Sequence, residues 1–209
     1  MAETREGSVE TSIHGRMLIR DGDPQRVLVG FHGYAENAER HMAELLRLPG
    51  VEGWTVAAVQ GLHRFYTKGG EVVASWMTSQ NRELLLADNI AYVRRAVATF
   101  GSPRTLVFAG FSQGTAMAYR AAAAIPAQAL LVLGGDLPED VSAQADVHLP
   151  LTLLARGKSD DWFTAEKMAR DAAALRRIAR ELRTLEFDGG HEWSEEFRQA
   201  AGEVLRSLT

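Results

Sequence analysis

Short runs of apolar and β-branched residues alternate along this chain with longer segments in which apolar residues recur every three or four positions. The first pattern is typical of a strand buried on both faces, and the second is typical of an amphipathic helix. We therefore predict strands at 26–31, 54–60, 105–109, 129–133, 150–155 and 184–187, preceded by a hairpin of two short strands within 8–20. Helices are predicted at 36–48, 82–100, 115–124, 163–182 and 193–208.

The alternation of strands and helices predicts an α/β fold, with a mostly parallel, twisted sheet covered by helices on both faces. No internal repeat and no Gly/Ser- or Pro-rich linker interrupts the pattern, so we expect residues 1–209 to form a single domain without a separate lid domain. Ligands of such sheets bind at the carboxyl ends of the strands. The residues that follow each predicted strand are therefore the ones to search for chemistry.

Composition and charge exclude several classes of protein. Apolar residues make up 46% and charged residues 24% of the chain, which is typical of a globular protein, and a formal net charge of −4 does not suit a nucleic-acid binder. The absence of Cys excludes disulfides, zinc–thiolate sites and a Cys nucleophile. The first ten residues, MAETREGSVE, lack the apolar core of a secretory signal, and no apolar run is long enough to span a membrane. We therefore expect a cytoplasmic protein.

The segment Gly110-Phe111-Ser112-Gln113-Gly114 matches the G-x-S-x-G pattern of a nucleophilic serine. A predicted strand leads into it and a predicted helix follows, which is the context in which this pattern places a serine hydroxyl on a sharp turn. The turn is so tight that side chains two positions before and after the serine would clash, which explains both glycines. A serine that merely caps the helix is the alternative, and the strand–turn–helix context favours the nucleophile.

A serine hydroxyl becomes a useful nucleophile when a neighbouring base accepts its proton. His191 is the favoured base because it follows the last predicted strand, where Gly189 and Gly190 let the loop bring the ring over the edge of the sheet. His32 also follows a strand, and beside Gly33 we expect it to be a buried, hydrogen-bonded residue that shapes the loop. The histidines expected at the surface are His14, His41 and His148, and His63 is left open as a pocket residue.

The base needs a carboxylate that holds its tautomer and stabilises its charged form. Three aspartates follow predicted strands: Asp160 and Asp161 come after the strand at 150–155, and Asp136 comes after the strand at 129–133. We favour Asp160 and interpret Asp161 as a helix-capping or solvated residue. The spacing alone does not decide among the three.

Acyl transfer through a serine forms a tetrahedral oxyanion, which two backbone N–H groups can stabilise. One is expected to be the N–H of Gln113, directly after the nucleophile. The other is expected in the loop after the first buried strand, where Gly33 allows close approach and the N–H of Tyr34 is the natural candidate. The helix that starts after Ser112 also points its N-terminal amides toward this place and favours negative charge there.

Together these motifs resemble the phospholipase/carboxylesterase family of small α/β hydrolases, which includes the acyl-protein thioesterases. The family's His-Gly, G-F-S-Q-G, G-x-x-D and Gly-His elements match residues 32–33, 110–114, 157–160 and 190–191. The resemblance implies the α/β-hydrolase fold and a triad of Ser112, Asp160 and His191, with no cofactor and no metal. It favours Asp160 over Asp161 as the acid, and it implies carboxylic ester or thioester substrates.

Apolar and aromatic residues on the loops above the predicted sheet suggest an acyl pocket, although ordinary packing is the alternative for several of them. The candidates for contact with the substrate are Phe65, Tyr66, Trp76, Leu137 and Trp162.

The function that these observations predict is that of a serine esterase or thioesterase, of the carboxylesterase, lysophospholipase or acyl thioesterase type. It should act on a small-molecule ester or thioester, with no nucleic-acid partner and no membrane span, and a homodimer is compatible with the sequence. The alternatives are a peptidase or lactonase on the same scaffold, and a non-catalytic binding protein on the same fold. An intact triad disfavours the last, because a binding protein needs no base beside its serine.

Overall fold

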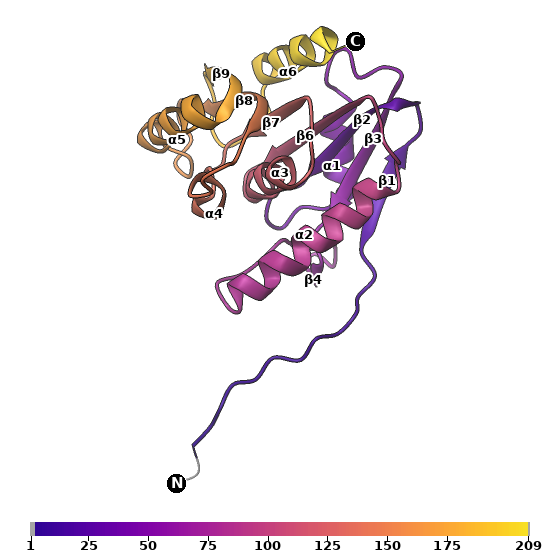
Figure 1. The fold of residues 1–209 in the computed structure, drawn as a ribbon, viewed down its shortest axis with the longest axis vertical. Helices are drawn as coiled ribbons and strands as arrows, with labels where there is room; N and C mark the ends of the chain where they lie inside the picture. Colours follow the sequence, from indigo (N-terminus) through magenta and orange to yellow (C-terminus); the bar gives the residue numbers. More distant parts are fainter. Residues whose placement is uncertain (1–2, 209) are drawn as a thin grey trace.

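A seven-stranded, mostly parallel sheet forms the centre of the computed structural model, which describes residues 3–208 (Figure 1). The strand order is β1-β3-β2-β6-β7-β8-β9, and of these seven strands only β1 runs antiparallel to its neighbour. The strands are β1 (Arg16–Arg20), β2 (Asp23–Phe31), β3 (Trp54–Gln60), β6 (Thr105–Phe111), β7 (Ala129–Leu133), β8 (Leu149–Gly157) and β9 (Ala179–Phe187). The two ends of the predicted domain, residues 1–2 and 209, lie outside the described residues.

Helices cover both faces of the sheet, and two separate apolar clusters fill the two interfaces. The first cluster joins one face to α2 (Arg82–Ala98), α3 (Gln113–Ala124) and α5 (Ala165–Ile178). The second cluster joins the other face to α1 (Ala38–Leu45) and α6 (Glu195–Ser207). Along β2, Val27, Val29 and Phe31 belong to the first cluster and Leu28 to the second, because successive side chains of a strand point to opposite faces. The α/β architecture predicted from the sequence is therefore confirmed.

The first predicted element, a hairpin within residues 8–20, is wrong. Only its second half forms a strand, β1, which pairs with β3. Residues 3–15 contain no helix or strand, and this segment extends away from the rest of the molecule (Figure 1). Val9 and Ile13 are exposed, so the apolar residues that suggested a strand find no face to pack against.

The predicted helix at 163–182 also runs too far. The helix α5 ends at Ile178 and β9 begins at Ala179, so the chain passes from helix to strand without a loop. β9 pairs with β8 from Ala179 opposite Leu149 to Phe187 opposite Gly157. The backbone N–H and C=O groups of this segment would be hydrogen-bonded either in a longer helix or in a strand. The strand also gains apolar contacts within the sheet, so this tertiary packing favours β9 over a continuation of α5.

Two short elements were not predicted. β4 (His63–Tyr66) and β5 (Val72–Ser75) form a separate two-stranded hairpin, and α4 (Glu139–Ser142) is a single turn. Gly70, in the turn of the hairpin, has a φ of 80°, which glycine adopts readily. Elements of four residues carry too few apolar positions to show a period, so the sequence pattern does not reveal them.

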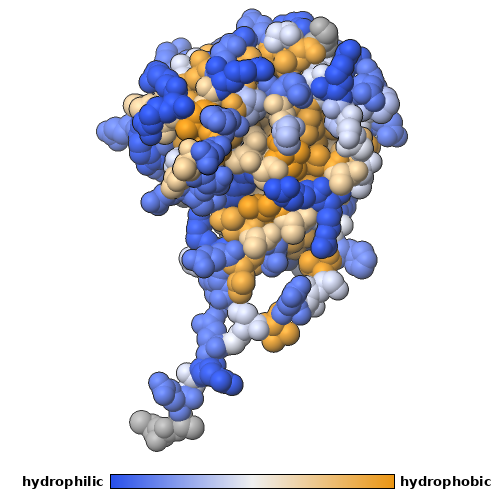
Figure 2. Space-filling view, in the orientation of Figure 1, coloured by the Kyte–Doolittle hydropathy of each residue, from blue (hydrophilic) through white to orange (hydrophobic). Residues whose placement is uncertain are grey.

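The surface of the molecule is mixed in character. Hydrophilic residues cover most of the face in view and most of the N-terminal segment, whereas apolar residues gather near the middle of that face (Figure 2). Within residues 3–208, no helix is both long enough and apolar enough to cross a bilayer.

His41, predicted at the surface, is buried on the inner side of α1. Its ring lies 5.7 Å from the ring of Trp193, and a Cβ on Gly30 would come within 2.5 Å of Nε2, so the bare backbone of Gly30 makes room for the imidazole. Neither ring nitrogen has a hydrogen-bond partner within the described residues. Burial therefore lowers the pKa of His41 to about 3, with a smaller contribution from the charge of His32. The prediction was wrong because this position lies on the apolar stripe of the helix, whatever residue type occupies it.

Acidification should destabilise the protein partly through His41. A histidine whose pKa falls on folding contributes stability above its unfolded pKa of 6.5, and that contribution is lost as the pH falls toward about 3. Between pH 7 and pH 5 this loss should be about 2 kcal/mol, because one pKa unit corresponds to about 1.4 kcal/mol. We expect the His41→Leu variant to lose about 2 kcal/mol less than the wild type over this interval, as measured by urea unfolding at each pH. An equal loss in the two proteins would contradict a neutral, buried ring.

Candidate active site

Ser112 lies on a strained turn between β6 and α3, at the carboxyl edge of the sheet. Its backbone has a φ of 52° and a ψ of −120°, a conformation that residues other than glycine rarely adopt and that costs on the order of 1–3 kcal/mol. Ser112 occupies the N-cap position of α3, but its side chain makes no capping hydrogen bond. The alternative of a simple capping serine is therefore wrong, and the hydroxyl is free for another partner.

Close backbone contacts around this turn require both of its glycines. A Cβ on Gly110 would lie 2.5 Å from the carbonyl oxygen of Gly114 and 2.7 Å from the Cα of Thr115. A Cβ on Gly114 would lie 2.0 Å from the carbonyl oxygen of Phe31, the last residue of β2. Neither glycine has a positive φ, so space and not conformational freedom excludes a side chain. The clash that the sequence pattern predicted is thus present in the structure.

Three side chains from separate loops form a continuous line of hydrogen bonds. The Oγ of Ser112 is 2.7 Å from Nε2 of His191, and Nδ1 of His191 is 2.8 Å from Oδ2 of Asp160. Because a carboxylate can only accept, Nδ1 carries the proton and Nε2 is left to accept the proton of the serine hydroxyl. The imidazole can therefore act as a base toward the hydroxyl while the carboxylate stabilises the resulting positive charge.

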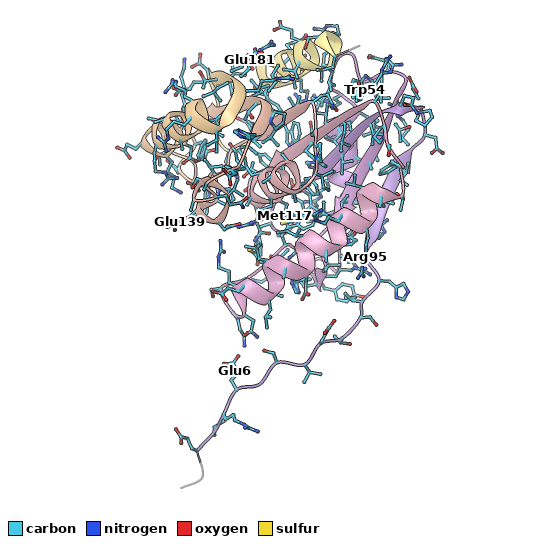
Figure 3. The ribbon with its side chains drawn as sticks, viewed as in Figure 1. Glu6, Trp54, Arg95, Met117, Glu139 and Glu181 are labelled. Atoms are coloured by element: carbon cyan, nitrogen blue, oxygen red, sulfur yellow. The ribbon has the colours of Figure 1, made fainter. Side chains whose placement is uncertain are left out.

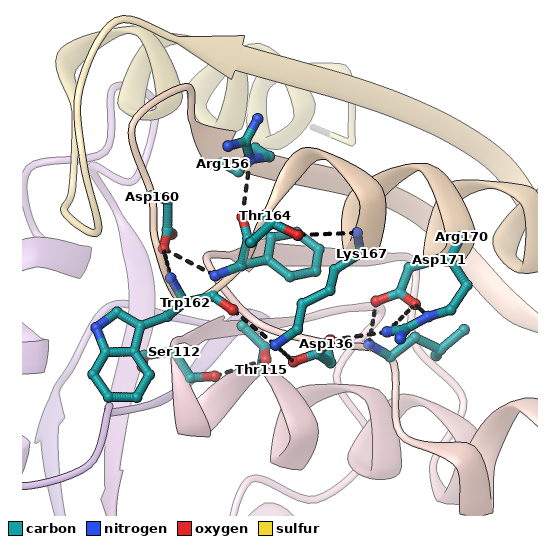
Figure 4. A network of polar contacts seen from close by, with 12 residues as sticks. Ser112, Thr115, Asp136, Arg156, Asp160, Trp162, Thr164, Lys167, Arg170 and Asp171 are labelled. Atoms are coloured by element: carbon teal, nitrogen blue, oxygen red, sulfur yellow. Dashed lines mark hydrogen bonds and ion pairs between the residues drawn. The ribbon is translucent and has the colours of Figure 1, made fainter.

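The loop after β8 holds Asp160 in place (Figure 4). Its Oδ1 accepts hydrogen bonds from the backbone N–H groups of Trp162 at 2.8 Å and Phe163 at 2.9 Å, which leaves Oδ2 for His191. The buried side chain of Arg156 donates from Nε to the carbonyl oxygen of Phe163 at 2.9 Å and so ties the far end of the loop back to β8. The carboxylate is buried with both oxygens occupied, so its orientation toward the imidazole is fixed.

The two other aspartates considered as the acid lie in different surroundings. Asp136 forms ion pairs with Lys167 at 3.3 Å and with Arg170 at 2.8 Å, as Figure 4 shows. Asp161 is exposed. Of the three carboxylates, Asp160 is the one in contact with His191.

Close packing of two loops brings His191 into position. A Cβ on Gly157, at the end of β8, would lie 2.2 Å from the carbonyl oxygen of Gly190 and 2.4 Å from that of Gly189. The ring of Phe111 lies 5.0 Å from the imidazole and supports it. Gly189 and Gly190 do not have positive φ values, so the close approach to Gly157, rather than the backbone freedom expected of the two loop glycines, explains how the ring reaches the serine.

The N–H groups of Tyr34 and Gln113 have no hydrogen-bond acceptor within residues 3–208. Gln113 is the first residue of α3 and directly follows the serine. The loop that carries Tyr34 lies against Ser112, since a Cβ on Gly33 would be 3.3 Å from the Cβ of the serine. Ala35 in this loop has a φ of 57°, which marks a tight turn. Two unpaired donors are therefore available close to the hydroxyl, one in each of two neighbouring segments.

Glu36 is a site residue that sequence reasoning did not select. Its Oε2 accepts a hydrogen bond from the N–H of Gly33 at 2.7 Å, and its own N–H donates to the carbonyl oxygen of Gly33 at 3.3 Å. Burial raises the pKa of Glu36, and the hydrogen bond from Gly33 opposes this shift. The carboxylate fixes the loop on which the N–H of Tyr34 lies. The available signal was an acidic residue directly after a His-Gly-Tyr-Ala segment.

His32 is buried and both of its ring nitrogens are occupied. Nδ1 donates to the carbonyl oxygen of Gly33 at 2.6 Å, and Nε2 accepts from the N–H of Gly61 at 3.0 Å. Burial lowers its pKa, which favours the neutral ring. His32 therefore has the packing role expected for it and no nitrogen free to accept a proton from Ser112.

A pocket of about 410 Å³ opens beside Ser112 and His191. Of the predicted substrate contacts, Trp76 and Trp162 are among its lining residues. Trp76 is fully buried, and its backbone N–H donates to the side-chain oxygen of Gln113 at 3.0 Å, whereas Trp162 is largely exposed at the rim. The pocket thus has one fixed wall and one exposed aromatic edge.

The remaining predicted contacts, Phe65, Tyr66 and Leu137, do not line this pocket. The ring of Phe65 lies 5.7 Å from that of Tyr34, and Tyr66 is exposed at the end of β4. Leu137 is buried in the first cluster and packs in the core. Within residues 3–208 no group of three or more metal-ligating side chains lies together.

Gly157→Ala should destabilise the protein far more than Gly190→Ala. The added methyl group at 157 would overlap two carbonyl oxygens, whereas at 190 the nearest atom would be 4.0 Å away. Overpacking of this kind costs about 1–3 kcal/mol, so we expect a loss of about 2 kcal/mol for Gly157→Ala and less than about 0.5 kcal/mol for Gly190→Ala. Chemical denaturation of both variants checks this, and equal losses would contradict the close contact between the loops.

Comparison with known proteins identifies the architecture. No family model and no curated protein matches the chain. Among solved structures, esterase PE8 is 19% identical with a TM-score of 0.76, and the match covers 94% of this chain and 100% of that one. The phospholipase/carboxylesterase from Dyadobacter fermentans is 17% identical with a TM-score of 0.73, covering 95% and 100% of the two chains. Acyl-protein thioesterase 2 from Zea mays is 17% identical with a TM-score of 0.71, covering 93% and 99%. Similarity at these identities establishes the fold, and this chain has the α/β-hydrolase fold that the resemblance implied.

Proposed function

We propose that this chain is a serine hydrolase that cleaves carboxylic esters or thioesters through an acyl-enzyme intermediate. The observation that carries the proposal is the pair of hydrogen bonds from Ser112 to His191 and from His191 to Asp160. A serine hydroxyl needs such a base to attack a carbonyl, whereas a binding site needs neither the base nor a strained serine. The similar solved structures are named as an esterase, a phospholipase/carboxylesterase and an acyl-protein thioesterase, which supports ester or thioester chemistry.

In the first half of the reaction, Oγ of Ser112 forms a bond to the carbonyl carbon of the substrate while its proton moves to Nε2 of His191. Asp160 stabilises the imidazolium through Nδ1 and keeps the ring oriented, without taking the proton itself. The carbonyl π electrons move to oxygen and form the tetrahedral oxyanion. When the oxyanion collapses, the bond to the alcohol or thiol breaks and the leaving group receives the proton from Nε2.

In the second half, water attacks the acyl-serine ester, with His191 again accepting the proton. The second tetrahedral oxyanion collapses, the acid product is released, and the proton on Nε2 returns to Oγ of Ser112. The same base therefore serves both halves, and no cofactor enters either step.

The N–H groups of Tyr34 and Gln113 are the donors that we propose for the oxyanion. Each lacks a hydrogen-bond acceptor within residues 3–208, so neither has to break a hydrogen bond to that part of the chain to receive the charge. Donors fixed in this way act mainly on the transition state, where charge develops, and cost no reorganisation. The N-terminus of α3 adds a favourable dipole in the same direction.

Ser112 should react with a fluorophosphonate probe. The hydroxyl activated by His191 attacks the phosphorus and displaces fluoride, so we expect stoichiometric labelling of the wild type and none of Ser112→Ala, measured by intact-mass spectrometry. Ser102→Ala, which alters an exposed loop serine, is the matched control and should label like the wild type. Equal labelling of the wild type and Ser112→Ala would assign the nucleophile to another serine, and absence of labelling in all three would refute the catalytic proposal.

Asp160→Asn should lower kcat for short p-nitrophenyl esters by about 10³–10⁴-fold. The amide oxygen can keep the backbone hydrogen bonds of Trp162 and Phe163, while the amide nitrogen would face Nδ1 of His191 and force the proton onto Nε2, which then cannot accept the serine proton.

Asp136→Asn provides the matched control for this experiment. Its ion pairs with Lys167 and Arg170 are partly exposed and are worth at most about 1 kcal/mol, so kcat should change by less than about fivefold. A near-normal rate for Asp160→Asn together with an inactive Asp136→Asn would move the acid to the end of β7. Circular dichroism and thermal melting of both variants establish that they are folded.

A further inference from the structure

The pocket beside Ser112 extends along α3. Gln113, Ala116, Met117 and Arg120 line it, and residues three or four positions apart share one face of a helix, so they form a continuous wall. Figure 3 shows Met117 on the side of α3 that faces α2. At a rise of about 1.5 Å per residue, Arg120 lies about 12 Å along the helix axis from Ser112.

Arg120 presents a buried donor that has no acceptor. Its Nε and Nη2 donate to the two carboxylate oxygens of Asp140 at 2.8 Å and 2.7 Å. Only 2% of the residue is exposed, and its buried Nη1 has no hydrogen-bond partner within residues 3–208. Leaving a charged N–H group unpaired in a buried position is costly, so an unpaired donor of this kind calls for a partner. An oxygen supplied from the pocket would complete the hydrogen bonding of this guanidinium.

Arg82, at the start of α2, adds a second positive charge to the same end of the pocket. Its Nη1 contacts Sδ of Met77 at 3.5 Å, and it forms no ion pair with a carboxylate within the described residues. The hydrogen bond from Arg120 lowers the pKa of Asp140, and the charge of Arg82 adds a smaller effect in the same direction. Arg120 is thus paired with Asp140, whereas Arg82 has no carboxylate within ion-pair distance among residues 3–208, so this end of the pocket carries one guanidinium charge without a paired carboxylate.

The other walls of the pocket carry no comparable excess of charge. Lys167 is paired with Asp136 at 3.3 Å, and both line the pocket. Trp76, Met77 and Met117 also line the pocket, and all three are buried. The pocket is thus a mixed polar and apolar channel along α3, with the hydroxyl of Ser112 at one end and the guanidinium groups of Arg120 and Arg82 at the other.

From this arrangement, and resting on the proposed function, we propose that the acyl group of the substrate carries a carboxylate at its far end, which binds Arg120 and Arg82. A carboxylate fits because the planar guanidinium presents its N–H groups in the geometry that carboxylate oxygens accept. The leaving group has to stay beside His191, which protonates it at the Ser112 end of the channel. The acyl chain is therefore the part of the substrate that extends along α3 toward the arginines.

The test compares two series of p-nitrophenyl esters. One series consists of the monoesters of succinate, adipate and suberate, and the other has acyl chains of the same lengths that end in a methyl group. We expect the wild type to prefer the anionic ester by about tenfold in kcat/KM at the chain length that reaches the arginines, because one hydrogen bond to a charged group is worth about 1.5 kcal/mol or more. High salt should weaken this preference.

Variants of the two arginines test the assignment. Arg82→Gln removes an exposed charge and should lower the ratio of anionic to neutral kcat/KM by about tenfold. Arg120→Lys keeps the charge beside Asp140 but loses the free Nη1, and it should also lower the ratio. Arg95→Gln, which alters an exposed residue near the other end of α2, is the matched control and should retain the wild-type ratio. A wild-type ratio of one or less at every length, or a ratio that both arginine variants leave unchanged, would overturn the proposal.

A binding experiment separates failure of this inference from failure of the proposed function. Isothermal titration of Ser112→Ala with free suberate needs no catalysis, and we expect binding that the additional change Arg82→Gln abolishes. Arg82-dependent binding without hydrolysis of any ester would refute the proposed function and leave the anion site standing. Hydrolysis of neutral esters without suberate binding would refute the anion site alone.

Discussion

The close packing of bare backbone around Ser112 is the constraint on which the rest of the site depends. Gly110, Gly114 and Gly135 each bring a backbone segment so near the turn that a Cβ would meet another main-chain atom at 2.5 Å or less. The strained φ of Ser112 costs on the order of 1–3 kcal/mol, which an isolated strand–helix connection would relieve by changing conformation. Here β6 is buried along its whole length and α3 is buried on several sides, so relaxing the turn would require moving core elements. The fold therefore keeps the hydroxyl raised above the sheet edge.

The order of strands then determines which loops can meet the hydroxyl. Ser112 follows β6, whereas Asp160 follows β8, two strands away, and His191 follows β9 at the edge of the sheet. Adjacent strands lie about 4.8 Å apart, so the imidazole has to reach across roughly three strand spacings to contact the serine. The contact between Gly157 and the carbonyl of Gly190 directs the last loop inward, over the ends of the strands. The approach of His191 to Ser112 thus depends on packing between loops, and the sequence of either loop alone would not predict it.

A feature of the fold or of the candidate site can be predicted from the sequence when the contacts that determine it lie between residues close together in the chain. The glycines beside Ser112 can be predicted, because the clash that they avoid lies within five residues of one turn. His191 and Asp160 can be selected by their positions after strands, but choosing Asp160 over Asp136 requires knowing that Lys167 and Arg170 occupy the latter. That information depends on contacts between residues about thirty positions apart.

The failures have the same cause. His41 was misplaced because residue type was given more weight than position on the helical stripe, and the ring fits only because Gly30, from another element, has no side chain. Phe65 and Tyr66 were placed in the pocket because aromatic residues on a loop after a strand suggest a ligand site. Both residues lie on β4, a four-residue hairpin strand too short to show a period, and neither is among the residues that line the pocket beside Ser112. Pocket composition is therefore much harder to predict than the position of a nucleophile, since every wall comes from a different part of the chain.

The charges around the pocket show why this difference matters for substrate choice. The elements that hold the serine, the base and the acid are packed by the core and tolerate little variation in side-chain volume. Arg82 is exposed on α2, and Arg120 is buried on α3, about two helical turns beyond Ser112. Arg120 donates to Asp140 and Arg82 contacts Met77, so neither side chain belongs to the line of hydrogen bonds at Ser112. Under the proposed function, the chemistry depends on the backbone packing around Ser112, whereas the choice of substrate depends on the charged side chains of Arg82 and Arg120 farther from the serine.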